Sequence, residues 1–284
     1  MRKIVGILIL SLANMSFAED RFAAVEIKTQ QLTDKIYMLI GAGGNIGVSK
    51  GSDGLLMIDD QFAPLAPKIK QALSKLGTEL PAYLLNTHHH GDHTGGNAAF
   101  GADSLIIAHD NVRLRMVSGT PSAEKIALPV ITFEKQARIH FNNEEIQLIH
   151  MPNGHTDGDS IVYFTTSNVV HMGDHYFKDR FPYVDLGAGG SVDGMADNIA
   201  TALALIKDDT QVIPGHGPLA NKDDLKRYLA MLNTTSAQIK SAIRKGDSLE
   251  AILENGLGSQ WDTWGQGFIN EESWIQTLYS SYKN

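Results

Sequence analysis

The chain of 284 residues carries 32 acidic and 24 basic side chains, which gives a formal net charge of −8 at neutral pH. An acidic chain without a basic stripe repels phosphate backbones, so nucleic-acid partners are disfavoured. The sequence contains no cysteine, which excludes disulfides and thiolate metal ligands. Its hydrophobic content of 43% is ordinary for a globular protein.

The N-terminal segment has the pattern of a secretory signal peptide. It begins with two basic residues, continues with an almost wholly apolar run at 4–12, and ends with the small residues Ser16 and Ala18 at the −3 and −1 positions of a cleavage site. The apolar run is too short to span a bilayer comfortably as an anchor. We therefore expect residues 1–18 to be removed, which leaves a periplasmic or secreted protein with no membrane contact.

Short apolar runs separated by Gly- and Asp-rich turns predict strands in both halves of the chain. In the first half we expect strands at 25–29, 36–40, 46–49, 55–58, 83–85 and 105–108, and helices at 64–76, 97–100 and 111–116. In the second half we expect strands at 131–133, 137–141, 146–149, 161–165, 169–171 and 212–213, a helix at 195–206, a mostly helical stretch at 219–253 and a last helix at 271–282. This order favours two sheets packed together with helices outside.

The first candidate for chemistry is the histidine-rich segment 87–93, which follows a predicted buried strand. Residues two apart point the same way in an extended chain, so His88 and His90 can bind one metal together. Gly91 allows a sharp change of direction. Asp92 and His93 then face elsewhere and can serve a second metal nearby.

Three later turns, at 154–159, 171–175 and 214–217, each follow an apolar run and offer one good ligand: His155, Asp174 and His216. Imidazole and carboxylate ligands suit zinc, and positions left open for water are typical of a catalytic site. Two adjacent zinc ions can share a hydroxide, because zinc lowers the pKa of bound water to about 7. One such turn alone would be an ordinary loop, but four together predict a two-metal centre.

This ordered set resembles the metallo-β-lactamase superfamily, whose H-x-H-x-D-H motif is followed by a His, an Asp or Cys, and a His. The resemblance implies an α/β protein with the αβ/βα four-layer sandwich. A single domain would cover 19–284, with a helical C-terminal extension at about 220–284 and the site at one edge of the sheets.

The resemblance also implies roles for individual residues. His88, His90 and His155 would hold the first zinc; Asp92, His93 and His216 the second; and Asp174 would bridge them. Asp92 would also have a catalytic role, in which it helps to stabilise the leaving group and manage the proton. Asp59, which ends an early strand, and His175, which follows Asp174, would support these ligands from behind.

Such a site predicts a binuclear zinc hydrolase, β-lactamase-like, in which a metal-bound hydroxide attacks the carbonyl of a small-molecule lactam, lactone, or other ester or amide. Exported zinc β-lactamases carry Cys in place of Asp174 and a lysine in place of Phe177, so efficient antibiotic hydrolysis is in doubt. The alternatives are a thioesterase or a phosphate or sulfate esterase on the same site, since a bridging Asp is typical of glyoxalase-II-like enzymes. A mononuclear iron persulfide dioxygenase-like enzyme and a non-catalytic binding protein also remain open, although the latter would be expected to lose ligands.

Candidate substrate contacts follow Asp174 along the chain. We expect Lys178, Arg180 and Tyr183 to lie near the substrate. Tyr176, Phe181 and segment 187–191 would form one wall of the site. In the C-terminal loop, Trp261, Trp264 and Phe268 would either form a lid or anchor the tail against the core, and anchoring is the simpler role for aromatic side chains.

Overall fold

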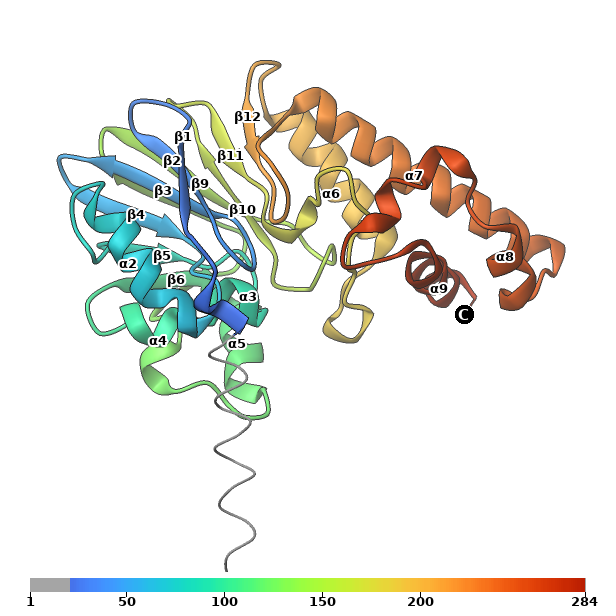
Figure 1. Ribbon diagram of the computed structural model, residues 1–284, viewed down its shortest axis with the longest axis horizontal. Coiled ribbons are helices and arrows are strands. Elements are labelled where there is room, and N and C mark those ends of the chain that lie inside the picture. Colours follow the sequence, from blue (N-terminus) through green and yellow to red (C-terminus); the bar gives the residue numbers. More distant parts are fainter. Residues whose placement is uncertain (1–20, 284) are drawn as a thin grey trace, which may run out of the picture.

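A computed structural model describes residues 21–283, so the expected signal segment 1–18 lies outside the described residues. Two β-sheets pack face to face, with helices on both outer faces (Figure 1). The αβ/βα sandwich expected from the sequence is confirmed. Within residues 21–283, no helix combines the length and the apolar character needed to cross a membrane.

The first sheet runs in chain order through seven strands: β1 (Lys28–Gln31), β2 (Ile36–Ile40), β3 (Ile46–Gly51), β4 (Gly54–Ile58), β5 (Tyr83–Leu85), β6 (Leu105–His109) and β7 (Ile131–Phe133). Strands β1 to β4 are antiparallel neighbours, and β4 to β7 are parallel. Parallel neighbours need crossover connections. These contain α2 (Ala66–Ser74), α3 (Gly91–Thr94), α4 (Asn97–Phe100) and α5 (Asp110–Ser118).

The second sheet has six strands in the order β13-β12-β11-β10-β9-β8. They are β8 (Gln136–Phe141), β9 (Glu144–His150), β10 (Ser160–Phe164), β11 (Val169–His171), β12 (Gln211–Ile213) and β13 (Ala220–Asn221). Only β11 and β12 are parallel, and α6 (Val192–Leu205) lies in the crossover between them. The helix begins after Ser191, whose hydroxyl accepts a hydrogen bond from Gly194 N.

Alternating side chains on the strands separate the cores. In β4, Leu56 and Ile58 face the second sheet, whereas Leu55 and Met57 face the helices outside the first sheet. In the second sheet, neighbouring residues of β10 divide in the same way between the inter-sheet core and the core under α6. The central strands of each sheet are therefore buried on both faces, which explains why they are nearly continuously apolar.

The C-terminal region consists of α7 (Lys222–Lys245), α8 (Leu249–Asn255) and α9 (Glu271–Tyr282), which lie beyond the second sheet (Figure 1). Helix α7 ends at Gly246, whose φ of 87° is the left-handed conformation that glycine adopts without strain. Trp274 of α9 is fully buried and donates a hydrogen bond to Thr235 of α7. Helices α7 and α9 are thus packed on each other, and apolar side chains of both join the core on the outer face of the second sheet.

The expected strand at 25–29 is misplaced, because the structure has β1 at 28–31. The apolar side chains of Val25 and Ile27 pack against the core beneath α2 instead of forming strand pairs. The edge strand itself is fully exposed and carries Lys, Thr and two Gln residues, so no apolar alternation marks it.

Candidate metal centre

The predicted ligands gather at one edge of the two sheets, where several strands end. His88 and His90 follow β5, and Asp174 follows β11. His216 follows β12, and His155 lies on the loop between β9 and β10. Because β4 and β5 are parallel, as are β11 and β12, the carboxyl ends in each pair open at the same edge.

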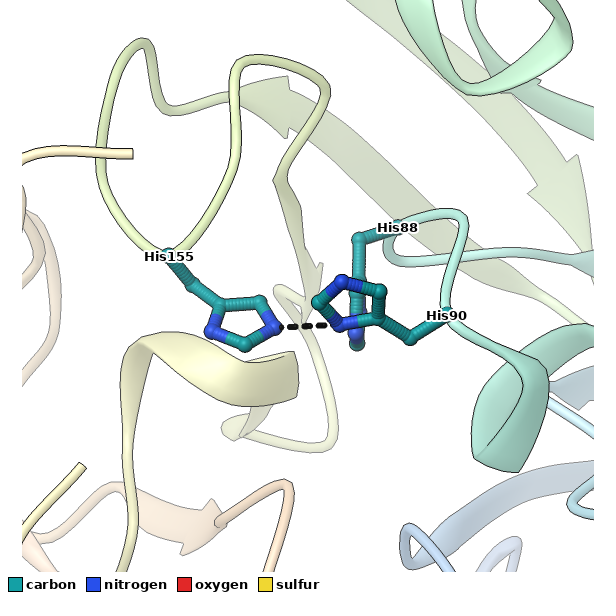
Figure 2. Close-up of side chains that lie close together, drawn as sticks. All are labelled: His88, His90 and His155. Carbon is teal, nitrogen blue, oxygen red and sulfur yellow. Dashed lines mark hydrogen bonds between the residues drawn. The ribbon is translucent and has the colours of Figure 1, made fainter. Parts of the chain in front are cut away.

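The first triad consists of His88, His90 and His155, whose potential ligand atoms all lie within 4.8 Å of one another. His90 Nδ1 and His155 Nε2 are 2.8 Å apart, and the three rings converge from two separate loops (Figure 2). His88 Nε2 is buried and has no hydrogen-bond partner among residues 21–283. Buried polar atoms are normally paired, so the orphaned nitrogen fits a metal ligand.

The second triad consists of Asp92, His93 and His216, again within 4.8 Å of one another. Asp92 Oδ2 lies 3.3 Å from His216 Nε2 and 3.7 Å from His93 Nε2. The ring of Phe177 stacks on that of His216 at a centroid distance of 5.2 Å and fixes its plane. Two imidazoles and a carboxylate form a second donor set of the kind that zinc takes.

Asp174 lies between the triads and directs one oxygen toward each. Its Oδ1 is 3.0 Å from His93 Nε2 and 3.3 Å from His216 Nε2. Its Oδ2 is 3.6 Å from His155 Nε2 and 3.9 Å from His88 Nε2. This is the arrangement that a carboxylate needs to bridge two metal ions.

The electrostatics of the two triads differ. Burial lowers the pKa of His155 to about 4, and burial together with the charge of His93 holds the pKa of His88 well below its usual value. Burial alone would also lower the pKa of His216, but the carboxylates of Asp174 and Asp92 outweigh it and raise that pKa to about 9. His88 and His155 of the first triad thus offer neutral imidazoles, whereas a metal at the second triad must displace protons from His216 and His93.

The sequence pattern that defines the Metallo-beta-lactamase superfamily matches residues 45–216, a span that contains all seven of these side chains. The chain belongs to this superfamily.

Among characterised relatives, the chain is 30% identical to hydroxyacylglutathione hydrolases of Pelagibacter ubique and Rhodospirillum rubrum. These matches cover 47% and 54% of this chain and 51% and 54% of the relatives. The chain therefore spans about half the length of the relatives that it matches.

Solved structures share the superfamily fold at low sequence identity. A metallo-β-lactamase from Pontibacter korlensis has a TM-score of 0.64 and 15% identity, over 73% of this chain and 99% of that protein. The sec-alkylsulfatase Pisa1 from Pseudomonas sp. has a TM-score of 0.72 and 16% identity, over 90% of this chain and 50% of that protein. The longer overlap with the sulfatase extends the fold similarity to more of this chain.

Behind the superfamily ligands, Asp59 is fully buried with a φ of 60°. Its carboxylate accepts hydrogen bonds from Thr87 N and Thr87 Oγ1, both at 2.8 Å, and pairs with His93 Nδ1 at 2.7 Å. This contact directs the Nε2 atom of His93 toward Asp174. Asp59 therefore occupies the supporting position that the sequence predicted.

His175 is buried behind the loop that carries His155. Its Nε2 lies 3.0 Å from Asn198 Nδ2 and 3.7 Å from the carboxylate of Asp159, which in turn accepts hydrogen bonds from Thr156. Burial lowers the pKa of His175 to about 3, so the ring is neutral. Its contacts support the loop and do not reach a side chain of either triad.

Sequence reasoning missed two contacts that orient the first triad. Asp185 Oδ2 lies 3.0 Å from His90 Nε2, and the carbonyl oxygen of Tyr183 accepts a hydrogen bond from His155 Nδ1 at 2.7 Å. Both contacts leave the opposite ring nitrogen facing the other triad members. In the sequence, Asp185 is only one more carboxylate after Asp174, and no motif links it to His90. His89 lies outside both triads, although one of its ring nitrogens forms a further cluster with His90 and Asp185.

A cavity of about 730 Å³ opens above the triads. Its lining combines charged and histidine side chains with aromatic and aliphatic ones: Arg21, Gly43, Phe62, His90, Asp92, Asp174, Phe177, Arg180, Phe181, Tyr183, His216, Phe268 and Ile269. This volume is typical of small-molecule sites.

The cavity tests the expected substrate contacts. Arg180 and Tyr183 line it. Lys178 is not among the lining residues, because its ammonium donates hydrogen bonds to Asp224 Oδ2 at 2.8 Å and to Leu219 O at 3.0 Å. The structure thus does not bring Lys178 to the cavity, since its charge is used to attach α7.

The expected aromatic wall is only partly formed. Phe181 lines the cavity, but Tyr176 is fully buried against Tyr228, and segment 187–191 packs beside the His155 loop. Trp264 is buried and stacks on Tyr228, so it anchors the tail. Phe268 is 89% exposed and lies on the lining of the cavity.

Proposed function

We propose that this chain is a binuclear zinc hydrolase, β-lactamase-like, that uses a metal-bound hydroxide to attack the carbonyl of a lactam, lactone, or other ester or amide. The observation that carries the proposal is the position of Asp174, with one oxygen toward each triad. Two complete triads support two metal ions over a single iron. One triad consists of His88, His90 and His155, and the other of Asp92, His93 and His216. Histidine and carboxylate ligands support zinc.

When bound, two zinc ions would supply a hydroxide at neutral pH and polarise the carbonyl. The protein's own contribution includes Asp92, which belongs to the second triad and also faces the cavity. Burial would raise the pKa of Asp92, but the hydrogen bond and charge of the neighbouring histidines His216 and His93 outweigh this and lower it. The carboxylate is therefore ionised at neutral pH and can accept a proton from the attacking group and pass it to the leaving group.

Thioester hydrolysis is the second candidate. It is supported by the relatives named hydroxyacylglutathione hydrolase, and by Asp174 in the position where exported zinc β-lactamases carry Cys. A thioester presents the same carbonyl to the same residues. The two candidates therefore differ in the leaving group and not in the metal centre.

The first experiment uses residues 19–284 loaded with zinc. Metal content is measured by mass spectrometry, and turnover is followed on a chromogenic cephalosporin, a lactone, an aryl ester and an S-acylglutathione, each with and without chelator. We expect two zinc ions per chain and chelator-sensitive turnover above about 1 s⁻¹ on at least one substrate. Asp174→Asn should lose metal and activity, whereas Asp103→Asn, a change of an exposed carboxyl, should lose neither.

Other outcomes would redirect the assignment. If only phosphate or sulfate esters are hydrolysed, attack on a carbonyl is refuted, whereas the proposal of a two-metal site is retained. One iron per chain with oxygen consumption on a persulfide would replace the hydrolase by a dioxygenase-like enzyme. Full activity of the cephalosporin assay in chelator would refute metal dependence.

We also propose that the protein is exported and acts on a small molecule outside the cytoplasm. The proposal rests on the signal-like sequence at 1–18. Intact mass of the protein recovered from the periplasm should correspond to a chain that begins at Glu19. A full-length chain confined to the cytoplasm would contradict export.

A further inference from the structure

Two arginines, Arg21 and Arg180, line the cavity above the metal centre. Neither forms an ion pair or a hydrogen bond through its guanidinium with any residue in the range 21–283. Both side chains are exposed. Arg115, Arg138 and Arg227, in contrast, pair with carboxylates, as in the bidentate contact of Arg115 with Asp157.

Arg21 is held at the cavity by the N-terminal segment. Its guanidinium carbon lies 4.6 Å from the ring centre of Phe22 and 5.2 Å from that of Phe62. The segment is attached by Lys68, whose ammonium donates hydrogen bonds to the carbonyl oxygens of Phe22, Ala23 and Val25 at 2.7–2.9 Å. A guanidinium stacked on rings keeps its N–H edge free to bind an anion.

Arg180 reaches the same cavity from the opposite half of the sequence. The backbone N–H of the next residue, Phe181, donates a hydrogen bond to Trp264 O at 3.1 Å. The aliphatic stem of Arg180 lies over Gly267, where an added Cβ would be only 3.0 Å from its Cδ. Packing of the stem on the loop leaves the charged end of the side chain at the cavity.

The remaining walls are mainly apolar. Phe62, Phe177, Phe181 and Ile269 line the cavity between the metal-facing side chains and the arginines. Phe268 is 89% exposed, and its ring lies edge-on to that of Tyr183 at a centroid distance of 6.4 Å. An apolar ligand could therefore cover the ring of Phe268. The protein as a whole is acidic, with a net charge of −8, so two guanidiniums without a carboxylate partner among residues 21–283 are a local exception at this cavity.

We propose that the substrates of this enzyme are amphiphilic anions, in which an apolar body fills the cavity and a carboxylate or sulfonate-like group is bound by Arg21 and Arg180. This inference rests on the proposed function, because it places the anionic group at the far end of the molecule from the reacting carbonyl. The proposal makes the N-terminal segment 21–25, which carries Arg21, part of the site that selects the substrate.

The test compares two dyes with the same ring system, 8-anilinonaphthalene-1-sulfonate and the uncharged N-phenyl-1-naphthylamine, on the zinc-loaded protein. We expect the sulfonate to bind about tenfold more tightly than the neutral dye, as for one charge-assisted contact. Arg21→Gln and Arg180→Gln should each remove part of this preference, and the double variant all of it. Binding of the neutral dye should stay unchanged, which shows that the cavity is intact.

Arg244→Gln removes the same charge from an exposed position at the end of α7 and is the matched control. The proposal is overturned if the sulfonate preference survives in the double variant, because the metals would then select the anion. It is also overturned if Arg244→Gln has the same effect as the cavity variants, since only the overall charge would then matter.

A kinetic comparison separates this inference from the proposed function. The 4-nitrophenyl ester of a monoacid is compared with the 4-nitrophenyl half-ester of a dicarboxylic acid of equal length. We expect the half-ester to have the lower KM in the unmodified protein and to lose that advantage in the double variant, so that the two esters then have the same KM. Hydrolysis of both esters with equal KM would overturn the anion site alone, whereas dye selectivity without any hydrolysis would overturn the proposed function alone.

Discussion

The substitution Asp59→Asn tests whether the buried carboxylate behind His93 prepares the metal centre. Asp59 adopts a φ of 60°, which Asn tolerates well among non-glycine residues, so the backbone should be retained. The change removes the negative charge and replaces one acceptor oxygen by an NH2 donor, which would face either Thr87 N or both Thr87 Oγ1 and His93 Nδ1. Loss of such a supporting contact typically weakens metal binding by about 10–100-fold, or about 1.4–2.8 kcal/mol.

Zinc affinity measured by competition with a chromogenic chelator gives this quantity directly. Asp59→Ala should lower the free energy of unfolding of the metal-free protein more than Asp59→Asn does. It leaves buried donors of Thr87 and His93 unpaired, at about 1–3 kcal/mol each, and places Ala in a left-handed conformation. Urea unfolding of the metal-free variants should show that difference. Asp103→Asn is the control, and zinc binding by Asp59→Asn as tight as in the unmodified protein would refute the supporting role.

Four further predictions follow from the site and its surroundings. His216, with its pKa raised to about 9, and His93, with its pKa raised well above 6.5, should release protons when zinc binds at pH 7.5, which an indicator dye would record. By the same shifts, the stability that these two histidines contribute to the metal-free protein should be fully present below pH 6.5 and, for His216, be lost as pH rises through about 9; a His216→Gln variant whose urea midpoint keeps the same pH dependence would contradict the assignment. Gly44→Ala should lose the zinc ion of the second triad, because its added Cβ would overlap the His93 ring, and two zinc ions per chain in this variant would argue against this packing. Lys178→Met should lower the free energy of unfolding by about 1–3 kcal/mol through loss of the partly buried pair with Asp224 while leaving KM unchanged, and an altered KM would restore Lys178 as a substrate contact.

The metal centre was largely predictable because its signal is local. His88, His90, Asp92 and His93 lie within six consecutive residues, and each remaining ligand follows a short apolar run that ends at the same sheet edge. Asp185 was not predictable in this way. It lies 95 residues from His90, and no strand or repeated motif marks the turn that brings the two together.

Strands with buried side chains were also found with small errors, because apolar runs bounded by turn residues mark them directly. Strand β1 was misplaced because an exposed edge strand carries no such mark. The substrate residues were harder to assign. Lys178 and Arg180 are two residues apart and similar in chemistry, and only the packing of α7 determines that one binds Asp224 and the other reaches the cavity.

Neither half of the chain contains a complete triad. The first triad takes His155 from the second half of the sequence, and the second triad takes His216 from it. The relative position of the two sheets therefore sets the distance between ligands, and that position depends on inter-sheet packing around residues such as Ile146. Enzyme activity should therefore be sensitive to this packing. A small displacement of one sheet relative to the other would separate the ligands of both triads while every strand and helix remained folded.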